Sequence, residues 1–218
     1  SSACSVNATT GAVTILTAGS CVVTATKAAD TNYNSASGNV TITIAKATQA
    51  TLTATKSGDT TYLSSSVVTV GTTGGSGAGA VSYASTTTGV CSVDSTTGVI
   101  TIVTAGTCSI TATKATDSSY LAATGSVSIT IAKANQGMVV ASPSRTTGVY
   151  GDAVSTSVSP SGGSGSGSYS YASTTASVCS VNASTGAVTI LTAGTCSITV
   201  TKAADGNYNV ATGSTSIV

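Results

Sequence analysis

The chain has 218 residues, of which only 6% are charged, against about 25% in typical soluble domains. It contains no His and no Glu, and its formal net charge is +1. These features exclude imidazole-based catalytic triads, His-ligated metals and paired Glu carboxylates, and they provide no electrostatic attraction to nucleic acid. We therefore predict a protein that is not an enzyme, needs no cofactor and binds no nucleic acid.

Ser and Thr together account for 81 residues, which favours disorder, but 40% of the chain is apolar. This supplies enough Val, Ile and Ala to build folded cores. No apolar run approaches the roughly 18 residues that a membrane span needs, so we predict no membrane insertion. Because the first residue is Ser, we expect a mature product or a part of a longer protein.

Three near copies follow one another, each marked by two Cys residues 17 positions apart. Successive copies are offset by 87 and 88 residues, a period that suits a small domain and is too long for a solenoid repeat. A segment reading Ile-Ala-Lys-Ala-x-Gln recurs at 44–49 and 131–136, where one copy ends and the next begins. We therefore predict the C-terminal half of a domain at residues 1–45 and complete domains at 46–132 and 133–218. They are called the first, second and third repeat below.

Alternating apolar and hydroxyl residues predict strands along the chain, for example at 40–45, 51–55 and 108–113. Their β-branched side chains suit a pleated sheet, and no stretch shows a helical stripe. Several short strands in each copy predict an all-β fold of β-sandwich domains. We expect turns at residues 9–11, 96–98 and 184–186, and longer flexible Gly-rich connections at 74–79 and 162–167.

The second and third repeats differ most near their starts. Aligning Gly58-Asp59 with Gly151-Asp152 gives an offset of 93, whereas Lys46 and Lys133 are 87 residues apart. This alignment predicts an insertion around residues 141–145 of the third repeat. Insertions of this kind usually lie in surface loops.

Residues 83–112 contain the pattern Tyr-Ala-Ser-Thr, Val-Cys-Ser-Val-Asp, Thr-Gly-Val and Thr-Ala-Gly-Thr-Cys-Ser-Ile-Thr-Ala, in that order. The pattern resembles the C-terminal half of bacterial Ig-like domains, and it occurs in all three copies. The resemblance implies tandem seven-strand Ig-like β-sandwich domains, as in giant surface adhesins, extracellular filament proteins and some phage structural proteins. The chain departs from that family by its regular Cys pairs and by Tyr83 and Tyr171, where a Trp often packs.

Cys91 and Val93 have the same strand parity, as do Cys108 and Ile110, so both Cys side chains should point into the sandwich. We predict one intradomain disulfide per repeat, each contributing about 3 kcal/mol by the chain-entropy estimate. Buried free thiols are the alternative, and the absence of His and of any CxxC argues against zinc. Disulfides indicate an oxidising compartment, so we expect an extracellular or cell-surface location. The predicted pairs are Cys4–Cys21, Cys91–Cys108 and Cys179–Cys196.

In each repeat, the strand that carries the second Cys leads into a loop that contains an Asp and a Tyr. Asp30-Thr-Asn-Tyr-Asn and Asp205-Gly-Asn-Tyr-Asn mimic alternating oxygen ligands for calcium, but the second repeat, at Asp117, breaks the pattern. We favour a turn in which Asp accepts local N–H groups and Tyr closes the sandwich end. Lys46 and Lys133 could form isopeptide crosslinks, although junction lysines are the simpler interpretation. Alternating Thr residues fit an ice-binding grid, but they are also the ordinary solvent face of a strand.

Three Asn residues match the N-glycosylation pattern Asn-x-Ser/Thr, which is short and often unused. Sugars would help to keep a surface with few charges in solution. The candidate acceptors are Asn7, Asn39 and Asn182.

Only residues 46–50 separate two predicted strands, with no Pro or Gly hinge, so adjacent domains should bend little. We predict a structural segment of a long extracellular surface protein that forms a stiff stalk or filament shaft. The missing half of the first repeat would come from an upstream continuation or from a neighbouring copy by strand complementation. The alternative is a module of an adhesin tip or phage decoration protein that binds carbohydrate or host protein. Exposure of Tyr169 and Tyr171 would favour that alternative.

Overall fold

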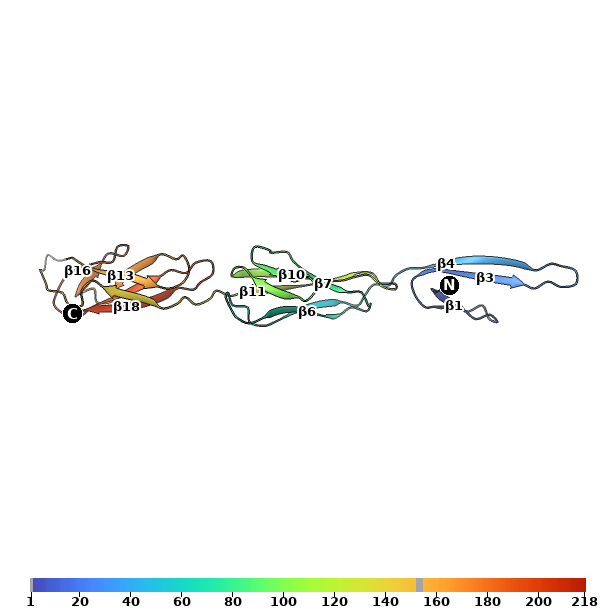
Figure 1. Ribbon diagram of the computed structural model, residues 1–218, viewed down its shortest axis with the longest axis horizontal. Helices are drawn as coiled ribbons and strands as arrows, with labels where there is room; N and C mark the ends of the chain where they lie inside the picture. Colours follow the sequence, from blue (N-terminus) through green and yellow to red (C-terminus); the bar gives the residue numbers. More distant parts are fainter. Residues whose placement is uncertain (1, 152–154) are drawn as a thin grey trace. The chain divides into compact units, whose positions relative to one another are not determined.

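The computed structural model describes residues 2–151 and 155–218, and this part of the chain forms eighteen strands and no helix (Figure 1). No helix that could span a membrane is therefore found among these residues. The all-β fold predicted from the alternating pattern is confirmed. By contacts between Cα atoms, the chain divides into two compact units. They are Ser1–Gly58 with Val67–Thr101 and Cys108–Ile129, and Asp59–Ser66 with Ile102–Thr107 and Thr130–Val218.

The third repeat, within the second unit, is a β-sandwich of seven strands in its described residues. A four-stranded sheet has the order β12-β13-β16-β15, and a three-stranded sheet has the order β14-β17-β18. Their inner faces share one buried core, which includes Val158, Ile198, Val200 and Ile217. The strands are β12 (Val139–Pro143), β13 (Thr156–Gly162), β14 (Tyr169–Ser173), β15 (Cys179–Val181), β16 (Ala187–Ile190), β17 (Cys196–Lys202) and β18 (Ala211–Ile217).

The second repeat has the same seven strands in the same order. One sheet is β5-β6-β9-β8 and the other is β11-β10-β7. The tandem Ig-like sandwich that the resemblance implies is therefore confirmed. The domain boundaries at 45/46 and 132/133 stay predictions. The strands are β5 (Leu52–Ser57), β6 (Val68–Gly74), β7 (Val81–Ser85), β8 (Cys91–Val93), β9 (Val99–Ile102), β10 (Gly106–Lys114) and β11 (Ala123–Ile131).

The first repeat contains only the counterparts of the last four strands. Strand β1 (Cys4–Val6) pairs with β2 (Val13–Ile15), and β3 (Gly19–Lys27) pairs with β4 (Ala36–Ile44). The pairing of Cys21 with Ile42 matches the register of the complete repeats after allowance for the offset. Residues 1–45 thus fold as half a sandwich, as their sequence match predicts.

This half sandwich leaves its apolar face uncovered. Ile129 on β11 is 2% exposed, but Ile42, at the same position of the first repeat, is 38% exposed. Ala112 is completely buried, whereas Ala25 is exposed. The covering side chains in the second repeat include Leu52 from β5 and are supplied by strands that have no counterpart in residues 1–45. We call the apolar side of β3 and β4 the open face.

The predicted insertion around residues 141–145 is wrong. Lys56 pairs with Val70, and Pro143 pairs with Val158, so β12 keeps the register of β5 as far as Pro143. The following loop is only one residue longer in the third repeat, ending at Thr156 where the second repeat has Val68. Asp152, on which the alignment depended, lies outside the described residues. The strand pairings on both sides of the loop show that the Gly-Asp match joined positions that are not equivalent.

The two equivalent isoleucines provide a test of the open face. Ile129→Ala should lower the unfolding free energy of the second repeat by about 2–5 kcal/mol, since it leaves a cavity in a packed core. Ile42→Ala should cost less than about 1 kcal/mol, since the side chain already contacts solvent. Hydrogen exchange of β10 and β3 under increasing urea reports each repeat separately. Equal costs for the two substitutions would mean that the open face is covered in solution.

Candidate functional site

Each disulfide crosses its sandwich from one sheet to the other. Cys179 begins β15 in the four-stranded sheet, and Cys196 begins β17 in the three-stranded sheet. Their Cα atoms are 5.6 Å apart, and both residues are fully buried. The predicted disulfide in each repeat is confirmed, with the pairs Cys4–Cys21, Cys91–Cys108 and Cys179–Cys196.

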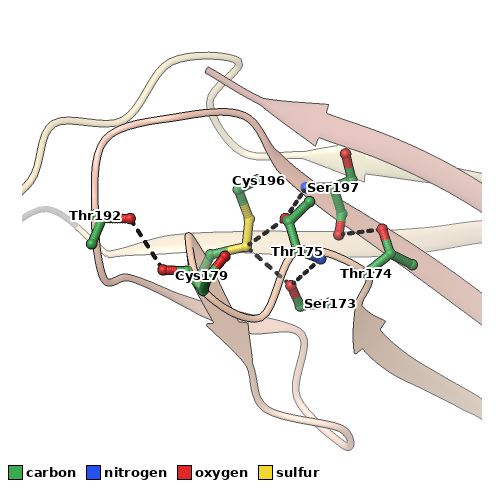
Figure 2. The surroundings of a disulfide bond; sticks show 8 residues. Ser173, Thr174, Thr175, Cys179, Thr192, Cys196 and Ser197 are labelled. Atoms are coloured by element: carbon green, nitrogen blue, oxygen red, sulfur yellow. Dashed lines mark hydrogen bonds between the residues drawn. A yellow bond between two sulfur atoms is a disulfide. The ribbon is translucent and has the colours of Figure 1, made fainter.

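Hydroxyl groups surround the disulfide of the third repeat, as Figure 2 shows. The Oγ of Ser173 lies 3.3 Å from the Sγ of Cys179, and the Oγ1 of Thr175 accepts a hydrogen bond from the N–H of Ser197. Ser85 and Thr87 occupy the same places beside Cys91 in the second repeat. These contacts fix the segment before the first Cys against the start of the strand that carries the second.

The Asp205 carboxylate organises the loop at residues 205–209. Its Oδ1 accepts the N–H groups of Asn207 and Tyr208 at 2.8 and 2.9 Å. Its Oδ2 accepts the N–H of Ser166 at 2.6 Å, which fixes the Gly-rich connection to the loop. The hydrogen bond from Ser166, followed by that from Asn207, lowers the pKa of Asp205 from 3.8 to about 2.

The other two Asp loops repeat the geometry. Asp117 accepts the N–H groups of Ser119, Tyr120 and Ala78, and the bond from Ser119 is the main cause of its lowered pKa. Asp30 accepts two N–H groups of its own loop. Because the carboxylate oxygens already accept backbone donors, the turn accounts for these Asp residues better than the calcium loop does.

The Gly-rich connections are packed segments, which differs from the flexible connections expected from their composition. Gly163 has a positive φ of 68°, and a Cβ there would collide with the Cδ of Lys202. Lys202 is 7% exposed, and its Nζ lies 4.3 Å from the ring centroid of Tyr169. Gly75 holds the same position against Lys114 in the second repeat. Glycine here permits the lysine stem to pack against the backbone.

One glutamine in each complete repeat fixes the start of that repeat to its Asp loop. The Nε2 of Gln136 donates to the carbonyls of Asn209 and Ala203 at 2.8 and 3.0 Å, and its Oε1 accepts the N–H of Ser164. Gln49 makes the matching bonds in the second repeat, for example to the carbonyl of Leu121. Neither glutamine was predicted to have a role, although both recur three residues after Lys46 and Lys133.

The two junction lysines make ordinary hydrogen bonds. Lys46 donates to the hydroxyl of Thr116 at 2.9 Å, and Lys133 donates to the backbone carbonyl of Asp205 at 2.6 Å. Neither contact places the amine on a carboxyl or carboxamide side chain, which an isopeptide crosslink needs. An ordinary role as hydrogen-bonded lysines at the junction therefore accounts for both residues.

The candidate glycosylation residues fall in two settings. The Oδ1 of Asn7 accepts the N–H groups of Thr9 and Thr10, and Asn182 makes the same turn with Ser184 and Thr185. Asp94 takes this role in the second repeat. The third candidate, Asn39, is exposed on β4 opposite Thr24. Glycosylation stays a prediction at all three positions.

The tyrosines that would have favoured a binding module are not an exposed cluster. Tyr171 is 8% exposed and belongs to the core, where its ring lies against Gly186. Tyr169 is half-buried, contacts Lys202, and donates its hydroxyl to the carbonyl of Gly162 at 2.5 Å. Both side chains have structural partners within their own sandwich.

Within the second unit, the chain is fixed by backbone pairing on both sides of Lys133. Ala132 pairs with the loop at 60–62, donating to the carbonyl of Thr60 and accepting the N–H of Tyr62 at 2.8 Å each. Ala134 forms a parallel bridge with Tyr208 of the Asp loop. Lys133 is therefore the single residue between two bridges.

Side chains add to this junction. The Oδ1 of Asn207 accepts the N–H of Ala105 at 2.8 Å. The rings of Tyr62 and Tyr208 meet edge to face, with centroids 5.7 Å apart and planes at 89°. From the sequence, Asn207 was predicted only as a possible calcium ligand, and neither Ala105 nor Tyr62 was predicted to have a role.

No protein-family model matches the chain, and no curated protein matches it. It is similar to a solved structure of protocadherin gamma B2 extracellular cadherin domains 3–6, with 14% identity over 85% of this chain and 56% of that chain, and a TM-score of 0.38. It thus spans about half the length of that fragment. Surface layer protein SbsC, domains 1–6, matches at 15% identity over 94% of this chain and 36% of that one (TM-score 0.31). A C-terminal 282-residue intimin fragment, solved with the intimin-binding domain of its receptor, matches at 20% identity over 78% and 64% (TM-score 0.31). At these values the comparisons carry no argument about function.

The lowered pKa of Asp205 makes stability depend on pH. The folded carboxyl has a pKa of about 2, below its ordinary value of 3.8, so its contribution is complete above pH 4 and is lost as pH falls toward 2. Asp205→Asn should lower the stability of the third repeat at pH 7 and flatten its decline between pH 4 and 2. Hydrogen exchange of β17 measures this, and exchange of β10 is the control. An unchanged acid profile would contradict the role of Asp205.

Proposed function

We propose that this chain is a structural, non-enzymatic segment of a long extracellular protein, acting as a stiff stalk or filament shaft. The observation that carries the proposal is the pairing on both sides of Lys133. A connection with one residue between two bridges has little freedom to bend, unlike a Gly- or Ser-rich linker. Repeats joined in this way transmit orientation from one to the next, as a shaft requires.

The disulfides support the proposed location outside the cytoplasm. Six of six Cys residues form three disulfides, and the chain has no free cysteine among its described residues. Stable disulfides of this kind form in oxidising compartments and are rare in reducing ones. A giant adhesin or surface filament is the kind of parent protein we propose.

The small number of charges suits a shaft that must keep its form in varied surroundings. With seven basic and six acidic residues in 218, few groups titrate or are screened by salt. Between about pH 5 and 9 the absence of His removes the side chain that most often changes charge.

Electron microscopy of the source cells tests the proposal. Antibodies raised against the third repeat should label fibres or stalks outside the cell, in regularly spaced positions along their length. The matched control is the same serum absorbed with purified chain. Label confined to the cell interior, or to isolated globular particles, would overturn the proposed shaft.

We also propose that the open face is completed by the front half of another repeat, of the kind seen in residues 46–85. In the second repeat, β5 and β6 supply the side chains of Leu52, Val68 and Val70 to this side of the core. Strands added in this way bind through main-chain pairing together with buried apolar side chains. The donor would be another copy of the protein or the part of the chain that precedes residue 1.

A peptide with the sequence of residues 46–85, added to the full chain, should bind with 1:1 stoichiometry. Amides of β3 and β4 should then exchange at least about tenfold more slowly, because bound strands cover them. The control peptide carries Leu52→Asp and Val70→Asp, which place charges against the apolar face. Equal protection by both peptides, or by neither, would contradict strand complementation.

A further inference from the structure

The end of the third repeat carries a pocket of about 460 Å³. Its lining comes from the loop at 148–150, the end of β16, the turn at 192–194 and the chain at 217–218. Its apolar lining includes Val149 and Tyr150, which are 67% and 70% exposed, and Ile217, which belongs to the core. Exposed apolar side chains beside a pocket are typical of a surface that receives a partner.

The second repeat has the same arrangement, but there a loop covers it. The turn at 104–106 matches the turn at 192–194, and Gly106 and Gly194 share a φ of 140°. Ala132 in the second repeat and Val218 in the third each donate to a carbonyl 72 residues earlier, at Thr60 and Thr146, so the two loops keep one register in which Tyr150 matches Tyr62. At this end of the second repeat, Asn207 binds the N–H of Ala105, and Tyr208 packs on Tyr62.

The burial of matching residues differs accordingly. Ala105 is half-buried beneath Asn207, whereas Ala193 is exposed at the same position. Tyr62 is half-buried against Tyr208, whereas Tyr150 lies open at the pocket. The pocket of the third repeat is thus the counterpart of a surface that is occupied one repeat earlier, and the occupant of that surface is an Asp-Gly-Asn-Tyr loop.

We propose that this pocket receives the Asp-Gly-Asn-Tyr loop of a further copy of the third repeat joined after Val218. The Asn side chain of that loop accepts the N–H of Ala193, and its Tyr ring packs against Tyr150. The inference rests on the proposed shaft and adds the residues that select which repeat can follow. The pocket accepts a following repeat whose loop carries Asn two residues after its Asp.

The chain itself contains both kinds of loop. Asn32 and Asn207 occupy the selecting position in the first and third repeats, but Ser119 occupies it in the second. A Ser side chain has a hydroxyl in place of the carboxamide, and its oxygen lies one bond nearer the backbone, so it does not substitute for Asn in the bond to Ala105. The loops therefore differ at the side chain that, in the third repeat, accepts a hydrogen bond from the preceding repeat.

One hydrogen bond and one ring contact are a small interface, far below the area that holds separate chains together. They suffice when a single residue joins the partners, because the covalent link makes the second contact intramolecular. This is why we assign the pocket to a repeat that continues the chain, and not to a separate molecule.

The test compares the full 218-residue chain with the same chain extended after Val218 by residues 131–218. Val218 holds the place of Thr130, so Ile131 and Ala132 are needed to rebuild the junction. Amide exchange is measured by NMR at Ala105, Ala193 and Val218. Val218, bonded to Thr146, is the internal reference. In the extended chain the Ala193 amide should exchange about fivefold more slowly than in the original, approaching Ala105.

Two variants of the added copy test whether the slower exchange at Ala193 depends on Asn207 of that copy. Asn207→Ala, made only in that copy, should abolish the slowing at Ala193, and Asn207→Ser should do the same. If Ala193 is unprotected while Ala105 stays protected, this inference fails and the proposed shaft stands. If Ala105 is unprotected in the original chain too, the junction behind the proposed shaft fails. Protection that arises from concentrating the unextended chain would overturn the assignment to a covalently joined repeat.

Discussion

Asp205 joins three parts of the third repeat through its carboxylate and its backbone carbonyl. It accepts N–H groups from its own loop and from the Gly-rich connection, and the adjacent backbone carbonyl accepts the amine of Lys133. The loop that it holds in shape presents Asn207 and Tyr208, and through them it reaches Ala105 and Tyr62. A half-buried acidic residue in a chain with few charges thus positions the groups that join repeats, and the same geometry recurs at Asp117.

The cores beneath these loops are built from small and β-branched side chains, since the chain has no Phe and no Trp. Each complete sandwich buries Val, Ile and Ala, together with one half-cystine from each sheet. Side chains of this size remove less apolar area from water than aromatic residues do, so a domain of fewer than 90 residues has a limited hydrophobic gain. A disulfide contributing about 3 kcal/mol is a large addition to that gain.

The sequence predicted the features that depend on periodicity. Alternating residues such as Ile129 and Ile131 indicated strands, and the 17-residue Cys spacing indicated the disulfides, because the regular repeat exposes both patterns. Features that depend on tertiary contact could not be predicted. Gln49 and Gln136 act through carbonyls about 70 residues away in sequence, and Asn207 binds an amide 102 residues earlier. The Gly-Asp alignment failed for a related reason. A two-residue match between loops does not show that the positions are equivalent, whereas the pairing of the flanking strands does.

The position of the disulfides also sets how each repeat would lengthen under mechanical load. In the second repeat the disulfide joins residues 17 apart. Both lie between the points where the chain enters and leaves that repeat. If the sandwich is pulled open, tension passes through the sulfur atoms and bypasses the residues between them. At about 3.4 Å per residue, the bridge withholds on the order of 50 Å of extension from each repeat. A reducing agent would release this length, so the extensibility of such a fibre would depend on the redox state of its surroundings.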